Sequence, residues 1–229
     1  MSDTLTVEQR GLVRIVTMDD GKANAFSLEV INDLRGLLRE AEADDETRSL
    51  VIAGREGRFS GGFDLSAMRA GDVDAVVELV AAGGALVADL YASPLTVVAA
   101  ATGHAVAAGA LVLLGCDHRV GVDGPVKIGL NEVAIGMVLP PWALIIARDR
   151  LSKRYFHSST TNARLFDGRT AVDAGFLDEV VAAESVVERA IEKATELSTL
   201  VPAAYARTVE VVRGPVIAEM RAVDPRSIL

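Results

Sequence analysis

Two segments rich in small residues constrain this chain more than any other feature of its sequence. The first is FSGGFDL at 59–65, and the second is GHAVAAGAL at 103–111. Each lies between an apolar run that is typical of a strand and a pattern that is typical of a helix. Because glycine and alanine leave the backbone uncovered, both turns can present main-chain N–H groups to a ligand.

A helix N-terminus at the second segment adds to this interpretation. The first N–H groups of a helix have no partner within it and carry partial positive charge, so they stabilise negative charge on a nearby oxygen. Small residues provide access in both segments: Gly61, Gly62, Ala107, Ala108 and Gly109. We therefore predict an oxyanion hole, in which each N–H donor typically contributes about 10²–10³ in rate.

Five stretches of the sequence resemble the crotonase superfamily, which contains enoyl-CoA hydratases and isomerases. Residues 59–65 resemble its F-x-A-G-A-D-L signature, and residues 103–117 resemble its G-x-A-x-G-G-G-x-E-L-x-x-x-C-D element. The other three are Asn24–Ser27, Asn131–Met137 and Ala171–Val181. All five stretches occur along the chain in the same order as in the family. The chain is identified as a member of this superfamily over about residues 10–182.

The resemblance implies an α/β fold, a crotonase-like right-handed β-β-α superhelix with a C-terminal helical trimerisation region. We expect the core with the acyl-CoA site at 1–182 and the helical region at 183–229, within one domain. Expected partners are an acyl-CoA substrate and further copies of the chain, in a homotrimer or a dimer of trimers.

Local residue patterns agree with alternating strands and helices. Apolar runs predict strands at 12–18, 49–53, 96–102, 119–122 and 126–128. Ser27 and Asp72 are each expected to cap a helix whose apolar residues recur at helical spacing. After Pro140 and Pro141 we expect a mostly helical chain, including residues 185–200.

Composition excludes several classes of partner. A net charge of −9 argues against nucleic acid, because the chain lacks a basic stripe. The single cysteine, Cys116, precludes an intramolecular disulfide and favours a reducing cytoplasm. The apolar run 95–114 is interrupted by Gly103, His104 and Gly109, so it is interpreted as buried rather than membrane-spanning. No His, Cys or Asp cluster has metal-ligand spacing, and we expect no metal.

The resemblance assigns roles to particular residues. The N–H groups of Phe63 and Ala108 occupy the two donor positions, where alanine and glycine are commoner. Glu132 occupies the position of one of the two glutamates that hold water in the hydratases, although Asn131 replaces the usual proline before it. The position of the other glutamate is occupied by Leu111, one helical turn after Ala108.

This replacement favours one reaction over another. Loss of a general acid or base typically costs about 10²–10⁴ in rate, so hydration by Glu132 alone should be inefficient. Moving a double bond from the 3,4 to the 2,3 position of an acyl-CoA needs only one carboxylate, which takes a proton from C2 and returns it at C4. We therefore expect an enzyme of this family in which double-bond isomerisation is favoured over efficient hydration.

Other residues are expected to border the substrate. By resemblance, Lys22, Asn24 and Ala25 lie near the CoA adenine, and Arg55 and Arg58 are further candidates for phosphate contact. CoA arrives as part of the thioester, so no separate cofactor is expected. The pocket is expected to be bordered by four further residues: Gly62, Asp64, Leu111 and His104. Asp64 is expected to act chiefly as a structural hydrogen-bonding residue.

Two alternatives remain open. Some superfamily members hydrolyse carbon–carbon bonds of β-diketones with histidine, and His104, His118 and His157 raise that chemistry here. Alternatively, Leu111 and Ala108 could mark a catalytically weak acyl-CoA binding protein. The chain also has little sequence beyond residue 212 to form the C-terminal wall of the pocket, so a neighbouring subunit is a candidate to complete it.

Overall fold

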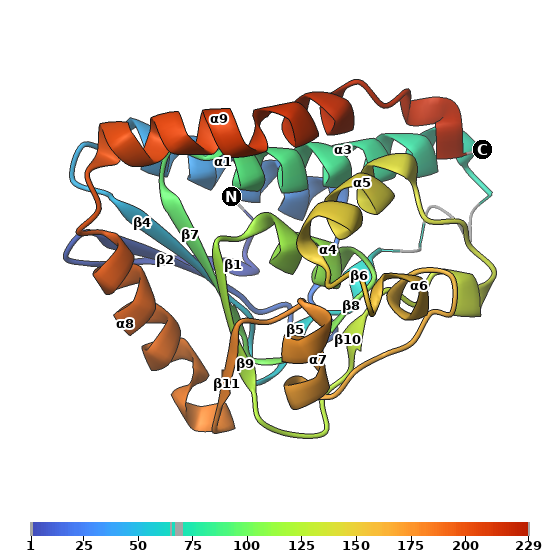
Figure 1. Ribbon diagram of the computed structural model, residues 1–229, viewed down its shortest axis with the longest axis horizontal. Helices are drawn as coiled ribbons and strands as arrows, with labels where there is room; N and C mark the ends of the chain where they lie inside the picture. Colours follow the sequence, from blue (N-terminus) through green and yellow to red (C-terminus); the bar gives the residue numbers. More distant parts are fainter. Residues whose placement is uncertain (1, 65, 67–70, 229) are drawn as a thin grey trace.

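The computed structural model describes residues 2–64, 66 and 71–228; Leu65, the last residue of the first motif, lies outside them. Its main feature is a six-stranded sheet with the order β1-β2-β4-β7-β9-β11 (Figure 1). The strands are β1 (Leu5–Arg10), β2 (Val13–Met18), β4 (Ser49–Ala53), β7 (Thr96–Ala101), β9 (His118–Val122) and β11 (Glu179–Val181). The pair β1–β2 is an antiparallel hairpin, and every other neighbouring pair in this sheet is parallel.

The chain also forms two smaller sheets. One has the order β10-β8-β5 and the other pairs β3 with β6. Their strands are β3 (Ala25–Phe26), β5 (Gly57–Ser60), β6 (Gly62–Phe63), β8 (Gly103–Val106) and β10 (Ile128–Gly129). A strand of the large sheet is thus followed by one of a small sheet and then by a helix, as in β7, β8 and α4 (Ala108–Gly115). This succession confirms the predicted β-β-α architecture.

The central strands are buried on both faces. Every residue of β4 and β7 is buried, which explains their continuous apolar sequences. Helix α8 (Val186–Leu197) covers one face, where Ala190 and Ala194 pack against strand residues such as Val51 and Val98. The opposite face packs against α1 (Leu28–Ala43), α3 (Val73–Ala92) and α4.

Helix starts agree with the predicted caps. The Ser27 hydroxyl accepts a hydrogen bond from the Val30 N–H at 3.2 Å, and the Asp72 carboxylate accepts one from the Ala75 N–H at 3.0 Å.

The later helices are α5 (Pro141–Arg150), α6 (Phe156–Ser159), α7 (Gly168–Ala174), α8 and α9 (Pro202–Arg221). Short 3₁₀ turns occur at Val133–Ile135, Ala183–Ser185 and Pro225–Ile228.

The C-terminal helix returns across the molecule. Helix α9 runs along α3 and also packs against α5 (Figure 1). Asp117 fixes it, because its carboxylate accepts hydrogen bonds from Tyr205 at 2.8 Å, from Arg213 and from the Val97 N–H at 2.6 Å. The predicted use of this helical region in trimer assembly stays a prediction.

The structure differs from the sequence-based expectation at several strands. The short strands β3, β5, β6 and β8 lie in stretches that were not predicted as strands. Strand β1 was not predicted, because five of its six residues are exposed and its apolar pattern is weak. The strand expected at 126–128 is instead Ile128–Gly129, since it pairs only where it lies beside β8. The three-residue β11 interrupts the mostly helical C-terminal half. Among the described residues, no helix has the length and apolar character to cross a membrane.

Candidate active site

The two small-residue turns meet in the folded chain. Gly62 has a φ of +97°, and a Cβ placed on it would lie 2.9 Å from the Ala107 Cβ and 3.2 Å from the Val106 carbonyl oxygen. A Cβ on Gly109 would lie 2.7 Å from the Ser60 carbonyl oxygen. Glycine is therefore required at both positions because backbone approaches backbone closely.

Each turn contains a candidate main-chain donor. The Asp64 N–H donates to the Phe26 carbonyl at 3.0 Å, and the neighbouring N–H of Phe63 points to the opposite edge of β6. Ala108 is the first residue of α4, and the first bond within that helix runs from the Leu111 N–H to the Ala107 carbonyl at 3.1 Å. The Ala108 N–H therefore has no acceptor within the helix.

A strained residue sets the direction of the second donor. Ala107 precedes α4 with a φ of +50° and a ψ of −125°, a conformation that residues other than glycine rarely adopt. It provides no side-chain cap, so the first turn of α4 keeps its N–H groups available. Strain of this kind is typical of sites where the backbone has a specific task.

Beside the turns lies a cavity of about 510 Å³. Its lining includes Gly61, Phe63, Ala107, Leu111, Asn131 and Glu132. Ala108 and Gly62 are buried and do not line the cavity. The structure thus brings the two turns, Leu111 and Glu132 together, although they come from three separate parts of the sequence.

Glu132 is a buried carboxyl group at the cavity. Its side chain is at the N-terminal end of the 3₁₀ turn after β10, its exposed fraction is 6%, and its Oε2 atom has no hydrogen-bond partner. Burial raises the pKa of Glu132 from 4.5 to about 7. Near neutral pH the group can therefore both accept and return a proton.

Leu111 lies on the same cavity as Glu132. It is 1% exposed and comes one turn after Ala108 in α4, as predicted. Among the described residues that line the cavity, Glu132 is the one that carries a carboxyl group. Asn131 contributes a buried Oδ1 atom without a hydrogen-bond partner. The cavity is otherwise mostly apolar, which accounts for the raised pKa.

The residues proposed for CoA lie at a different turn. The Asn24 side chain is committed to the backbone: its Nδ2 donates to the Met18 and Phe59 carbonyls at 2.8 and 3.2 Å. Ala25 pairs with Gly62 between β3 and β6. Lys22 is exposed, and its carbonyl accepts hydrogen bonds from the Arg55 guanidinium. Arg58 has a buried Nε without a partner.

Asp64 and the histidines lie outside this cavity. The Asp64 carboxylate accepts a hydrogen bond from the Ser66 N–H at 2.9 Å, consistent with a structural role. His104 accepts a hydrogen bond from the Lys127 N–H at 2.8 Å, and burial lowers its pKa. His118 pairs with Glu179 at 2.9 Å, and His157 is exposed. None of the three lines the cavity, and the described residues contain no acidic, histidine and cysteine group suited to a metal ion.

Sequence reasoning missed the far wall of the cavity. Val76 and Val80 of α3 and the segment from Ile135 to Pro140 also line it. The signal for α3 was present, because residues 73, 76, 77 and 80 form its apolar face. That periodicity marks a buried face without telling which part of the face borders a cavity.

Known proteins resemble this chain in architecture and in sequence. The family model described as enoyl-CoA hydratase/isomerase matches residues 8–222. Human mitochondrial enoyl-CoA delta isomerase 1 is 32% identical over 188 residues, which are 78% of this chain and 60% of that protein. The chain therefore spans about three fifths of the length of this relative.

Two solved structures match this chain over nearly the whole length of both proteins. An enoyl-CoA hydratase/isomerase family protein from Pseudomonas syringae has a TM-score of 0.95 and 37% identity, covering 99% of both chains. The apo enoyl-CoA isomerase of Mycobacterium tuberculosis has a TM-score of 0.92 and 38% identity, covering 97% of this chain and 96% of that one. With these matches and the paired turns beside Glu132, the chain belongs to the enoyl-CoA hydratase/isomerase family.

Proposed function

We propose that the protein moves the double bond of a 3-enoyl-CoA thioester to the 2,3 position. The observation that carries this proposal is the composition of the cavity, where Glu132 is the single carboxyl residue among the described lining residues and faces apolar neighbours such as Leu111. Isomerisation needs one group that removes a proton and returns it. Hydration would need a second group to activate or hold water.

The proposed chemistry balances without a further reactant. Ionised Glu132 takes a proton from C2, and the electron pair of that bond forms the thioester enolate. The N–H groups of Phe63 and Ala108 stabilise the enolate oxygen. The enolate oxygen then re-forms the thioester carbonyl while the double bond forms between C2 and C3. The electron pair of the former C3–C4 double bond takes the proton from protonated Glu132 at C4. No water is consumed.

Two features of the site support a proton shuttle. The raised pKa of Glu132, about 7, keeps both of its protonation states accessible near neutral pH. Its buried Oε2 atom has no hydrogen-bond partner within the described chain, so no neighbouring side chain holds that oxygen. The histidines contact other parts of the protein, so a histidine-based hydrolase gains no support from the geometry.

The CoA part of the substrate is proposed to lie toward the turn at residues 20–25. Arg58 is a basic side chain proposed to contact it, and its buried Nε has no partner within the described chain. Asn24 would act there through the conformation of the turn rather than through its occupied amide.

The decisive experiment compares 3-enoyl-CoA and trans-2-enoyl-CoA as substrates of the wild type and Glu132→Gln. We expect isomerisation by the wild type to exceed hydration, and to fall at least about tenfold in Glu132→Gln. Glu42→Gln is the control, because Glu42 is a carboxyl group with a raised pKa that instead contacts Ser93. Equal isomerisation by wild type and Glu132→Gln would refute the proposed role. Binding without turnover would favour an acyl-CoA binding protein.

A further inference from the structure

Two adjacent glycines lie in the middle of helix α3. Gly83 and Gly84 are both buried there. Apart from proline, glycine is the least favourable residue in the interior of a helix, so a buried pair indicates that packing requires the absence of side chains. The two positions serve different neighbours, because each glycine faces a different aromatic ring.

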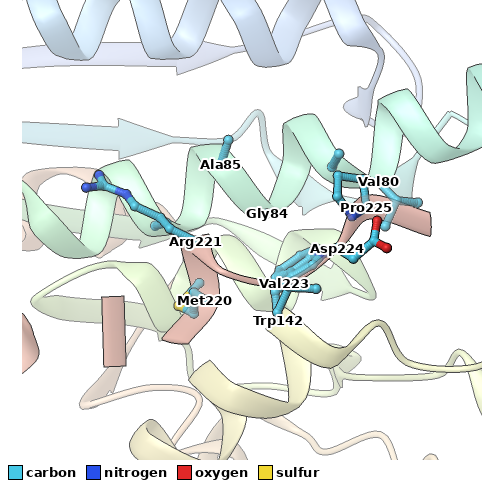
Figure 2. A pocket seen from close by; sticks show the side chains of 11 residues that line it. Val80, Gly84, Ala85, Trp142, Met220, Arg221, Val223, Asp224 and Pro225 are labelled. Carbon is cyan, nitrogen blue, oxygen red and sulfur yellow. The ribbon is translucent and has the colours of Figure 1, made fainter. Parts of the chain in front are cut away.

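Gly84 faces the ring of Trp142 in α5. A Cβ placed on Gly84 would lie 3.0 Å from three atoms of that ring. Figure 2 shows Trp142 beside the part of α3 that contains Gly84. Both residues also line a cavity of about 180 Å³. A Trp142 ring that is pushed away from α3 therefore has space beside it.

Gly83 faces the ring of Phe63, and the contact is closer. A Cβ placed on Gly83 would lie 2.3 Å from the Phe63 Cζ and 2.5 Å from its Cε1, far below the separation of about 3.5–4.0 Å at which carbon atoms pack. Phe63, Gly83 and Ala108 border one gap in the core, which is too small to hold a water molecule. The Phe63 ring therefore rests directly on the α3 backbone.

The space open to a displaced Phe63 ring is the cavity of about 510 Å³ that contains Glu132, because Phe63 also lines that cavity. The backbone of Phe63 belongs to β6, which has two residues and forms a two-stranded sheet with β3. The ring reaches from this short strand to α3. Its contact with Gly83 therefore helps to fix the backbone that carries the proposed donor N–H.

We propose that Gly83 is a positioning residue for the oxyanion hole. It allows the Phe63 ring to pack on the α3 backbone, which keeps the ring out of the cavity and the Phe63 N–H directed at the substrate oxygen. The inference rests on the proposed function, because that function gives the N–H its task. A purely structural role predicts that an added side chain lowers stability. A positioning role predicts that it also weakens polarisation of the thioester, and that a smaller side chain at position 63 reverses this effect.

Polarisation can be measured without turnover. Butanoyl-CoA with ¹³C at the thioester carbonyl would be bound to each variant, and its carbonyl stretching frequency measured by infrared difference spectroscopy. Hydrogen bonds to the oxygen weaken the C=O bond, so we expect a lower frequency in the wild type than in the free thioester. Gly83→Ala should reduce this shift by about half or more, and the double variant Gly83→Ala/Phe63→Ala should recover most of it.

Activity should follow the same order. Gly83→Ala should lower kcat/KM for 3-hexenoyl-CoA at least about tenfold, and the double variant should exceed Gly83→Ala by at least about threefold. Phe63→Ala alone supplies the reference for the double variant. Phe63→Tyr approaches the contact from the other side, because its hydroxyl extends from Cζ toward α3. It should lower the carbonyl shift and kcat/KM while Gly83 is retained, and it tests the contact even if Gly83→Ala does not fold.

Two glycines provide matched controls. Gly84→Ala introduces a close contact in the same helix, but with Trp142 instead of Phe63. It should lower the thermal stability and change the carbonyl shift and kcat/KM by less than about threefold. Gly36→Ala controls for the exchange itself, because Gly36 lies in α1 and nothing is within 4 Å of a Cβ placed on it.

The outcomes separate this inference from the proposed function. Isomerisation and carbonyl shifts that neither Gly83→Ala nor Phe63→Tyr changes would overturn the inference and leave the isomerase intact. Equal losses in Gly84→Ala, or a loss in Gly83→Ala that Phe63→Ala does not relieve, would also overturn it. The expected carbonyl shifts without isomerisation would support the inference and refute the isomerase. Failure of butanoyl-CoA to bind the wild type would overturn both proposals.

Discussion

Gly62 lies against Ala107, so closely that a Cβ on the glycine would be 2.9 Å from the alanine Cβ. This contact joins the two turns that carry the proposed donors Phe63 and Ala108. Both residues have positive φ angles, +97° for Gly62 and +50° for Ala107. The distance between the proposed donors is therefore set by two unusual backbone conformations in contact. A single methyl group added to Gly62 would perturb that distance.

Gly62→Ala should separate the two donors. The added methyl group would collide with Ala107 and Val106, and the loss of one well-placed donor typically lowers the rate by about 10²–10³. The measurement is kcat/KM for a 3-enoyl-CoA, together with the thermal unfolding of the variant.

Gly11→Ala provides the control for backbone strain. Gly11 has a φ of +58°, and nothing lies within 4 Å of a Cβ placed on it. It should lose about 1 kcal/mol of stability through its conformation while retaining activity. If Gly62→Ala loses no more activity than Gly11→Ala, the contact between the turns has no catalytic importance.

Activity should depend on pH through Glu132. Proton removal requires the ionised carboxylate, and burial raises the pKa of Glu132 to about 7. We expect kcat/KM to rise with pH through this value and to level off above it. Measurements from pH 5 to 9 in Glu132→Gln should show low activity without this transition, whereas an unchanged transition would assign it to another group.

The same carboxyl group should reduce stability as the pH rises above about 4.5. The pKa of Glu132 rises from 4.5 in the unfolded chain to about 7 in the folded protein, so the folded state binds more protons between these values. Stability should therefore fall as pH rises through this window, by up to about 3 kcal/mol. Denaturant unfolding at pH 8 should find Glu132→Gln more stable than wild type, with the difference disappearing near pH 4.5; a constant difference would contradict the assignment.

Leu111→Glu should introduce hydration. The side chain at 111 lines the cavity together with Glu132, so a carboxyl group there could help to hold a water molecule. We expect hydration of trans-2-enoyl-CoA to increase at least about tenfold. Leu111→Gln is the control because it is similar in size and cannot exchange a proton. An equal gain with glutamine would indicate a change in polarity rather than acid–base chemistry.

A single-base shuttle should conserve part of an isotopic label. If Glu132 both removes and returns the proton, a substrate with deuterium at C2 should give a product with deuterium at C4, above the level expected from solvent exchange. Mass spectrometry after one turnover measures this transfer. Complete loss of the label in a short reaction would indicate exchange with water or a second acid.

The site was predictable where chemistry depends on backbone access. Gly61, Ala107, Leu111 and Glu132 occur in recognisable positions along the chain, and the fold brings them to one cavity, whereas Gly62, Ala108 and Gly109 do not line it. Ser27 and Asp72 were predictable as caps because that interaction is local, within three residues.

Other residues were not predictable because their partners are distant in sequence. The Asn24 amide is used by the carbonyls of Met18 and Phe59, a combination that exists only after β2, β3 and β5 have come together. His104 is four residues before Ala108, but the positive φ of Ala107 breaks the path between strand and helix. Sequence spacing therefore did not indicate where the imidazole lies. The position of Val80 became visible only through the cavity that it lines together with Glu132.

The strand order of the large sheet also describes how the chain can be made. From β1 to β11 each new strand is added beside the preceding one, without insertion between strands that are already paired. A nascent chain can therefore extend the sheet at its growing edge while it leaves the ribosome, and residues of the catalytic cavity are all synthesised by Pro140. Helices α5 to α9 are therefore made only after every described residue that lines the cavity.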